Sequence, residues 1–229
     1  MKYKNLIKTI FLFLFYLLYT LVFNKIFSFF NININTATMF LSDLIFFLVI
    51  IYLYREKIQN DLTHLKENQL KMIFIGVILL FLINLCLGMI TDIFFPSLSN
   101  FNDGNSSSVI QLFSASYLYS LFKTLLFAPI AEELLFKESI RDVVKNDIVF
   151  VITSSILYTT MNFFYSTIQF PYIWMDIIGY FLFSMVLSII YLKSQDNIVM
   201  VMIIKFLYNL IPTFILIISM IAGVIWWIF

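Results

Sequence analysis

Two adjacent carboxylates, Glu132 and Glu133, lie in an apolar part of the chain, and a lysine, Lys137, follows four residues after the second. All three belong to the segment APIAEELLFKESIR, residues 128–141. An ionisable group in a membrane span costs about 2.5–3.5 kcal/mol on insertion scales, so it is a functional candidate by default. The alternative is that these charges merely lie at the cytoplasmic interface of the membrane.

Local geometry predicts one paired and one unpaired carboxylate. Pro129 suits the first turn of a helix, so we expect a kink at 128–129 and a new helix from Pro129 towards Lys145. Both glutamates would then lie in the first turn, where the helix dipole favours negative charge. Glu133 and Lys137 are four residues apart with the acid first, which is the better order for a structural pair on one helix face. Glu132 points elsewhere and has no local partner.

Depth in the membrane brings further polar residues to the same level. At 1.5 Å per residue, Glu132 lies about 20 Å from the polar turn at 145–147, and Asn162 lies about 25 Å beyond that turn. Lys205 and Asn209 lie about 15 and 20 Å beyond the last polar turn. Polar groups that converge inside a helical bundle indicate a site. The alternative is that each one only ties two helices together by hydrogen bonds.

The composition indicates that these polar residues lie on membrane-spanning helices. The chain has 229 residues, of which 62% are hydrophobic and 12% charged, about half the charged fraction of a soluble domain. We therefore predict an all-α, polytopic transmembrane bundle of seven or eight spans. The last apolar run contains Pro212 and is expected to form two segments or one broken helix. The apolar runs cover residues 6–23, 37–54, 72–94, 110–136, 148–165, 172–192 and 197–229.

Loop charges predict the orientation. From the N-terminus onwards, the successive connections carry 3, 1, 4, 0, 3, 0 and 1 basic residues. Cytoplasmic loops carry the excess of Lys and Arg, so we expect a multi-pass protein of the cell membrane with a cytoplasmic N-terminus. The first apolar run is too long for a signal peptide and should be retained. We divide the chain into residues 1–108, three helices with a cytoplasmic loop at 55–71, and residues 109–229, which hold the polar segments.

Composition also argues against several functions. A net charge of +1 gives no basic surface for nucleic acid, and the single cysteine, Cys86, cannot form an intramolecular disulfide. The single histidine, His64, lies in the loop 55–71, so neither histidine nor another usual zinc ligand set is available in the bundle. We therefore expect no metal and no cofactor. For Asp43, inside the second span, we expect a contact that pins helices rather than catalysis.

Three segments resemble the motifs of one family. APIAEELLFK resembles the first motif of the CPBP intramembrane proteases (CAAX proteases and bacteriocin-processing enzymes, also called the Abi family), which has two glutamates, three residues and an arginine. SSILYTTMN, residues 154–162, resembles the second motif, an aromatic residue followed four positions later by histidine. Residues 176–209 are similar to the closing pair of helices, which end in histidine, three residues and asparagine. The resemblance covers about 129–210 and implies the four-helix core of that family.

The resemblance also implies roles for individual residues. Glu132 would be the base, Asn162 would hold a water, and Lys205 with Asn209 would stabilise an oxyanion. Glu133 and Lys137 would support the site. Three positions depart from the motifs: Lys137 replaces an arginine, and Asn162 and Lys205 replace the two histidines.

These departures bear on catalysis. Asn162 can hydrogen-bond a water but cannot exchange a proton with it at neutral pH. Lys205 could stabilise an oxyanion, or it could pair with Glu132 and neutralise the base; we favour the pair. Losing acid–base help and an oxyanion donor together could remove several orders of magnitude in rate.

Three functions stay open on this basis. We favour a pseudoprotease or weakly active member that binds a membrane peptide or a partner membrane protein, as immunity to a secreted peptide or control of a cell-envelope enzyme would require. The first alternative is an active glutamate-dependent intramembrane endopeptidase. The second is a transporter that uses the buried charges as an ion path.

Overall fold

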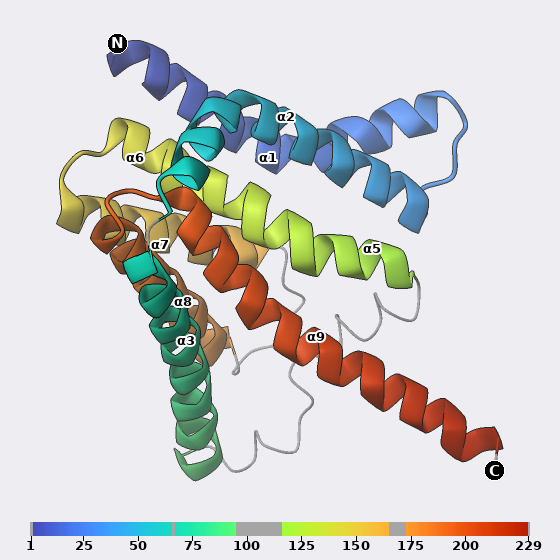
Figure 1. Cartoon of the computed structure of the whole chain (residues 1–229). Helices are drawn as coiled ribbons and strands as arrows, with labels where there is room; N and C mark the ends of the chain where they lie inside the picture. Colours follow the sequence, from blue (N-terminus) through green and yellow to red (C-terminus); the bar gives the residue numbers. More distant parts are fainter. Residues whose placement is uncertain (1, 66, 95–115, 165–172, 229) are drawn as a thin grey trace.

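The computed structural model of the chain describes residues 2–65, 67–94, 116–164 and 173–228. In these ranges the protein consists of seven continuous helices and has no strand, so the predicted all-α bundle is confirmed (Figure 1). By length and composition, α1, α2, α3, α8 and α9 can each cross a membrane, and α7 is a shorter apolar helix. The predicted connections 95–108 and 166–171 and one end of each of four predicted spans lie outside the described residues. The helical segments are α1 (Lys2–Phe29), α2 (Thr36–Thr63), α3 (Glu67–Phe94), α5 (Tyr117–Leu121), η1 (Phe122–Glu132), η2 (Leu134–Glu138), α6 (Ser139–Val143), α7 (Asp147–Phe164), α8 (Ile173–Lys193) and α9 (Ile198–Ile228).

The long helix formed by α5, η1, η2 and α6, called the central helix below, runs through the middle of the molecule (Figure 1). On one side it contacts the antiparallel pair α1 and α2, and on the other side it contacts α9. Helices α3, α7 and α8 form a second group in which α8 packs against both α3 and α7, α3 contacts α9, and α7 contacts the long helix at η2 and α6. The polar residues of the long helix therefore face neighbours on both sides.

The helix does not restart at Pro129, and this prediction was wrong. Residues Phe122–Glu132 and Leu134–Glu138 have the wider π-helical turn, with Pro129 inside the first stretch. A π turn bonds each N–H to the carbonyl five residues earlier instead of four. Proline can stay inside a membrane helix when a neighbouring helix satisfies the carbonyl that it leaves free. The helix ends at Val143, and the expected end at Lys145 is two residues too long.

The last apolar run forms a single helix of 31 residues, α9, so the expected break at Pro212 is absent. A helix of this length spans about 46 Å, more than the hydrocarbon core of about 30 Å. Figure 1 shows its C-terminal end extending away from the other helices. Next to the proline, Thr213 donates a hydrogen bond from Oγ1 to the Asn209 carbonyl at 2.7 Å.

Helix α3 approaches α8 and α9 closely at Gly76. A Cβ at this position would lie 2.8 Å from Ile204 Cδ1 and 3.1 Å from Ile190 Cδ1. By contrast, a Cβ at Gly88, three turns further along, would meet no atom within 4 Å. The first half of α3 therefore packs closely against α8 and α9, and its last turns do not.

A polar cluster joins the last turn of α2 to the start of α9. The Asp61 carboxylate accepts a hydrogen bond from the backbone N–H of Ile198 at 2.7 Å, which is the first residue of α9. Lys57 lies 3.1 Å from the Asp61 carboxylate and donates to the backbone carbonyl of Asp196 at 2.7 Å. Gln195 and Asp196 have positive φ values of 63° and 58°, so this turn is strained and held by its neighbours.

Candidate functional site

A buried lysine of α9 joins both glutamates of the central helix. The Lys205 Nζ lies 3.0 Å from Glu132 Oε2 and 2.6 Å from Glu133 Oε1. Lys205 is 2% exposed, Glu133 is 0% exposed and Glu132 is 8% exposed. The favoured pair between Lys205 and Glu132 is thus present, and Glu133 joins it as a second, unpredicted partner. Lys205 thus donates to two carboxylates at once. Hydrogen bonds between charged groups are shorter and stronger than those between neutral groups.

Lys137 does not pair with Glu133, so the predicted structural pair is wrong. Its Nζ donates to Ser184 Oγ at 2.6 Å and to Ser154 Oγ at 3.0 Å. Glu133 is instead paired with Lys205 of α9 at 2.6 Å, and the two serines of α7 and α8 take the Lys137 ammonium.

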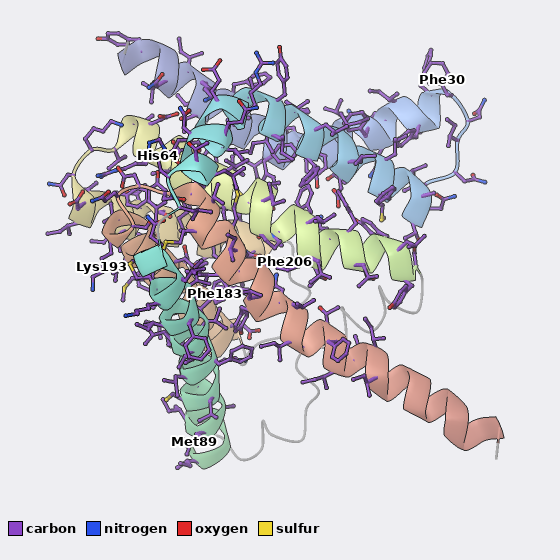
Figure 2. The ribbon with its side chains drawn as sticks, in the orientation of Figure 1. Phe30, His64, Met89, Phe183, Lys193 and Phe206 are labelled. Atoms are coloured by element: carbon purple, nitrogen blue, oxygen red, sulfur yellow. The ribbon has the colours of Figure 1, made fainter. Side chains whose placement is uncertain are left out.

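An aromatic ring lies between the two lysines. The Tyr158 ring centroid is 4.8 Å from Lys205 Nζ and 5.5 Å from Lys137 Nζ. Phe183 adds a second ring at 5.9 Å from Lys205 Nζ. Ammonium groups at such distances from aromatic faces are attracted by the ring quadrupole. Figure 2 shows Phe183 in the interior near α3 and α9, whereas Met89 lies towards the far end of α3.

Asn209 hydrogen-bonds the backbone of the central helix. Its Nδ2 donates to the Thr124 carbonyl at 2.8 Å. In a π turn that carbonyl would accept from the N–H of residue 129, and Pro129 has no N–H. Asn209 therefore replaces a hydrogen bond that proline removes, and uses one of its two N–H groups to do so.

Asn162 lies on α7 and donates from Nδ2 to the carbonyl of Tyr158 in the preceding turn at 2.9 Å. Its side chain is therefore folded back along its own helix instead of contacting Glu132. The structure brings Asn162 to the same cavity as the glutamate and the lysine, but no direct contact joins them in the described residues.

A cavity of about 320 Å³ joins these side chains. Four of the five predicted site residues line it, and Glu133 lies behind Glu132 outside the lining. The lining comes from α3, η1, α7, α8 and α9, so the site is built between helices as is usual for bundles. The residues are Leu80, Ile83, Asn84, Leu87, Ala128, Glu132, Tyr158, Asn162, Asp176, Gly179, Tyr180, Phe183, Lys205, Tyr208 and Asn209.

Sequence reasoning missed several of these positions. Asn84 and Asp176 line the cavity without belonging to a motif, and Ser154 and Ser184 receive the Lys137 ammonium. A polar residue inside a span was the available signal for Asn84 and Asp176. Serines gave no such signal, because their hydroxyls usually satisfy themselves on the preceding turn.

Asp43 forms a separate cluster with α1 and the central helix, as a helix-pinning contact predicts. Its carboxylate lies 2.6 Å from Lys123 Nζ and accepts from the Tyr119 hydroxyl at 2.8 Å. Tyr19 of α1 donates to the other oxygen. With the lysine and both hydroxyls bound, this buried carboxylate is fully partnered.

The arrangement limits the chemistry of Glu132. One oxygen is held by Lys205, and the other, Oε1, has no hydrogen-bond partner among the described residues. No group of three His, Cys, Asp or Glu side chains in the described ranges is arranged to hold a metal ion.

Comparison with known families matches the same part of the chain. Residues 114–211 match the family described as type II CAAX prenyl endopeptidase Rce1-like. No curated protein and no solved structure matches the chain significantly. The matched range contains the two glutamates, Asn162, Lys205 and Asn209 and thus most of the cavity lining. Residues 114–211 of this chain are thus similar to the Rce1-like CAAX proteases, the same kind of protein that the three sequence motifs resemble.

Proposed function

We propose that this protein is a pseudoprotease of the family, which binds a membrane peptide or a partner membrane protein in the cavity without cleaving it. The observation that carries the proposal is the position of Lys205, whose Nζ contacts both carboxylates at 3.0 and 2.6 Å. Its ammonium occupies the side of Glu132 where an activated water would need a partner. Immunity to a secreted peptide or control of a cell-envelope enzyme are functions that such binding could serve.

The loss of both histidines supports the same reading. Asn162 bonds its own helix and Asn209 bonds the Thr124 carbonyl, so neither amide is directed at Glu132 by a described contact. A general base and an oxyanion donor contribute about 10²–10⁴-fold and 10²–10³-fold respectively. The chain has lost or diverted residues of both kinds.

One feature favours the alternative of an active endopeptidase. Glu132 lines the cavity, and its Oε1 makes no hydrogen bond within the described residues, so this oxygen could hold a water. Lys205 would then have to act as the oxyanion donor. The transporter alternative has less support, because only Glu132 and Lys205 of the buried charges line the cavity, whereas Asp43 is held in a separate cluster with Lys123.

A cleavage assay with the purified protein in liposomes separates these functions. The substrates are envelope peptides, and the proteins are wild type, Glu132→Gln and the double variant Asn162→His with Lys205→His. We expect no cleavage by wild type and cleavage by the double variant, whose histidines restore the family chemistry. Wild-type cleavage that Glu132→Gln abolishes would overturn the proposal and establish the active enzyme.

We also propose that the protein is a multi-pass protein of the cell membrane with its N-terminus in the cytoplasm, as the distribution of basic residues supports. Reporter fusions at the N-terminus and within 137–147 test this orientation. Both should be cytoplasmic, and a reporter that is active only outside the cytoplasm at either position would contradict it.

A further inference from the structure

We infer that the cavity binds an unwound stretch of an apolar peptide by its main-chain amides, and that Asn84 of α3 is one of the residues that hold it. This inference rests on the proposed function, because it names the chemical group by which a bound peptide is recognised. Its basis is a set of side-chain amides that line the cavity and leave hydrogen-bonding groups unused.

Asn84 is the clearest member of this set. It lies about 25 Å along α3 from the first residue of that helix, a depth similar to the one that residue counting gives for Asn162. Asn84 lines the cavity and makes no hydrogen bond within the described residues. A side-chain amide in a membrane helix usually bonds a neighbouring helix, because an unpaired polar group in lipid is unfavourable. The described fold does not use this amide, so we assign it to the ligand.

Two more asparagines offer the same combination of groups. Asn162 Nδ2 donates to the Tyr158 carbonyl at 2.9 Å, and Asn209 Nδ2 donates to the Thr124 carbonyl at 2.8 Å. A carbonyl can only accept, so these bonds fix the orientation of both side-chain amides. Each side chain keeps a second N–H group and its Oδ1 atom, which have no partner in the part of the chain that the structure describes. Amides from α3, α7 and α9 thus present both donors and acceptors to one cavity.

The charged groups beside the cavity are already engaged, which favours an uncharged ligand. Glu132 and Glu133 share the Lys205 ammonium. Lys137, on the same helix as the two glutamates, is held by two serine hydroxyls. These two carboxylates and two ammonium groups sum to zero charge, and Asp176 takes part in an interaction of its own. The three amides and the second oxygen of Glu132 stay free in the described residues, and each of them can pair with an uncharged N–H or C=O group.

A main-chain amide supplies both groups, since it carries one N–H donor and one C=O acceptor. In a membrane helix both are bonded inside the helix, so a helical segment has no free donor to offer. An unwound segment exposes them, which is unfavourable in lipid unless other polar groups bond them. An ester-linked lipid offers acceptors without a donor and would leave the Oδ1 atoms unpaired. The free groups of the cavity therefore match an unwound peptide better than a lipid ester.

The packing of α3 leaves room for a chain beside Asn84. This residue lies between Gly76, where a Cβ would come within 2.8 Å of Ile204 Cδ1, and Gly88, where a Cβ would meet no atom within 4 Å. Asn84 itself is exposed. The cavity of about 320 Å³ is at the lower end of the range of about 300–1,000 Å³ for ligand sites, which suits a short stretch of chain. The α3 side also offers apolar contacts for the side chains of such a peptide, at Leu80, Ile83 and Leu87.

A binding experiment in lipid nanodiscs tests the main-chain contact with two probes. The first is a short, fluorescent, apolar peptide, capped at both ends so that it carries no charge. The second is the same peptide with its central amides replaced by esters, which keeps the side chains and removes the N–H donors. Binding to empty nanodiscs is subtracted for each probe. Because the ester probe leaves the cavity acceptors unpaired, we expect wild type to bind the amide probe about tenfold more tightly.

Variants of α3 test the role of Asn84. Asn84→Leu should weaken binding of the amide probe about fivefold, and Asn84→Gln should restore part of it. Because the amide has no partner in the described fold, Asn84→Leu should not lower the melting temperature in detergent, whereas loss of a contact between helices would lower it. Cys86→Leu is the matched control, since Cys86 is exposed on the same helix outside the cavity lining, and it should bind as wild type does.

Equal binding of the amide and ester probes, or no binding of either, would overturn the main-chain contact. Unchanged binding by Asn84→Leu, an equal loss in Cys86→Leu, or a lower melting temperature of Asn84→Leu would overturn the assignment of Asn84. Displacement of the amide probe by diacylglycerol would assign the cavity to a lipid instead of a peptide.

Mass spectrometry of the same samples distinguishes these failures from failure of the proposed function. Cleavage of the amide probe by wild type would remove the pseudoprotease and leave the main-chain contact in place. Equal binding of the two probes without cleavage would remove only the main-chain contact.

Discussion

Glu133 is the more deeply buried of the two neighbouring carboxylates, and its contact with Lys205 is the shorter. Its Oε1 lies 2.6 Å from the Lys205 Nζ, while its Oε2 is buried without a hydrogen-bond partner in the described residues. A buried carboxylate in this state depends strongly on the one ammonium that it has. Glu132, which faces the cavity, can exchange part of that contact for water or ligand.

Removing the charge of Glu133 should therefore cost more than removing a surface charge. Breaking one partner of a buried ion pair costs about 3–5 kcal/mol, so Glu133→Gln should lower the melting temperature in detergent clearly. Asp147→Asn, whose side chain is 67% exposed, is the control and should melt close to wild type. Equal melting temperatures for the two variants would show that the pair does not stabilise the fold.

The two buried lysines should differ in their importance. Lys205 contacts two carboxylates, whereas the described contacts of Lys137 are serine hydroxyls and the Tyr158 ring. Lys205→Met leaves two carboxylates without a cation and should destabilise more than Lys137→Met, which leaves two hydroxyls. Thermal melts of both variants test this order, and a larger loss for Lys137→Met would contradict it.

Sequence reasoning at this scale located the site but not its pairing. Counting residues from the polar turns placed Glu132, Asn162, Lys205 and Asn209 at similar depths, and all four line one cavity. The same reasoning joined Glu133 to Lys137 through α-helical spacing. That step failed because partners from other helices compete: Lys205 of α9 pairs with Glu133, and serines of α7 and α8 accept from Lys137.

At the scale of the elements, proline and asparagine on different helices act together. Pro129 leaves the Thr124 carbonyl without its backbone donor, and Asn209 of α9 supplies one at 2.8 Å. The central helix can continue through its proline because α9 compensates for it. An isolated reading of 128–141 could not foresee this, since the compensating residue lies 80 positions away (209 minus 129).

A double-mutant cycle tests this coupling. Asn209→Ala should cost about 1 kcal/mol when Pro129 is present, because a partly buried carbonyl then loses its donor. In the Pro129→Ala background the restored N–H can serve Thr124, so the same change should cost less. Thermal melts of the four proteins give the coupling energy, and strictly additive losses would contradict the shared carbonyl.

At the scale of the whole molecule, hydropathy predicted that the chain forms a helical bundle. Hydropathy does not predict which helices contact each other. Seven apolar runs correspond to the seven helices of the described residues. Hydropathy could not show that α3 forms one wall of the cavity, because Leu80, Ile83 and Leu87 look like any lipid-facing residues. It also could not show that α9 continues through Pro212, because the outcome depends on contacts outside the local sequence.

The contact between α2 and α9 provides a prediction at this scale. Asp61 is 8% exposed and caps the first N–H of α9, and its neighbour Lys57 holds the preceding turn. Asp61→Ala should cost about 0.5–2 kcal/mol, the usual effect of a lost N-cap, and should also loosen the two halves of the bundle. Asp142→Ala removes a longer pair with Lys8, at 3.7 Å, and is the control. Melting temperatures that fall equally would argue against a special role of Asp61.

The ion pair of Lys205 also concerns how the protein is made. The two glutamates precede their lysine by 73 and 72 residues, so the central helix emerges from the ribosome well before α9. During that interval both carboxylates are in the membrane, or near it, without the cation that they will share. A chain that is truncated before Lys205 would lack this cation. Completion of α9 is therefore the step of biosynthesis at which this charge is neutralised, and the pair couples the maturation of the central helix to synthesis of the last one.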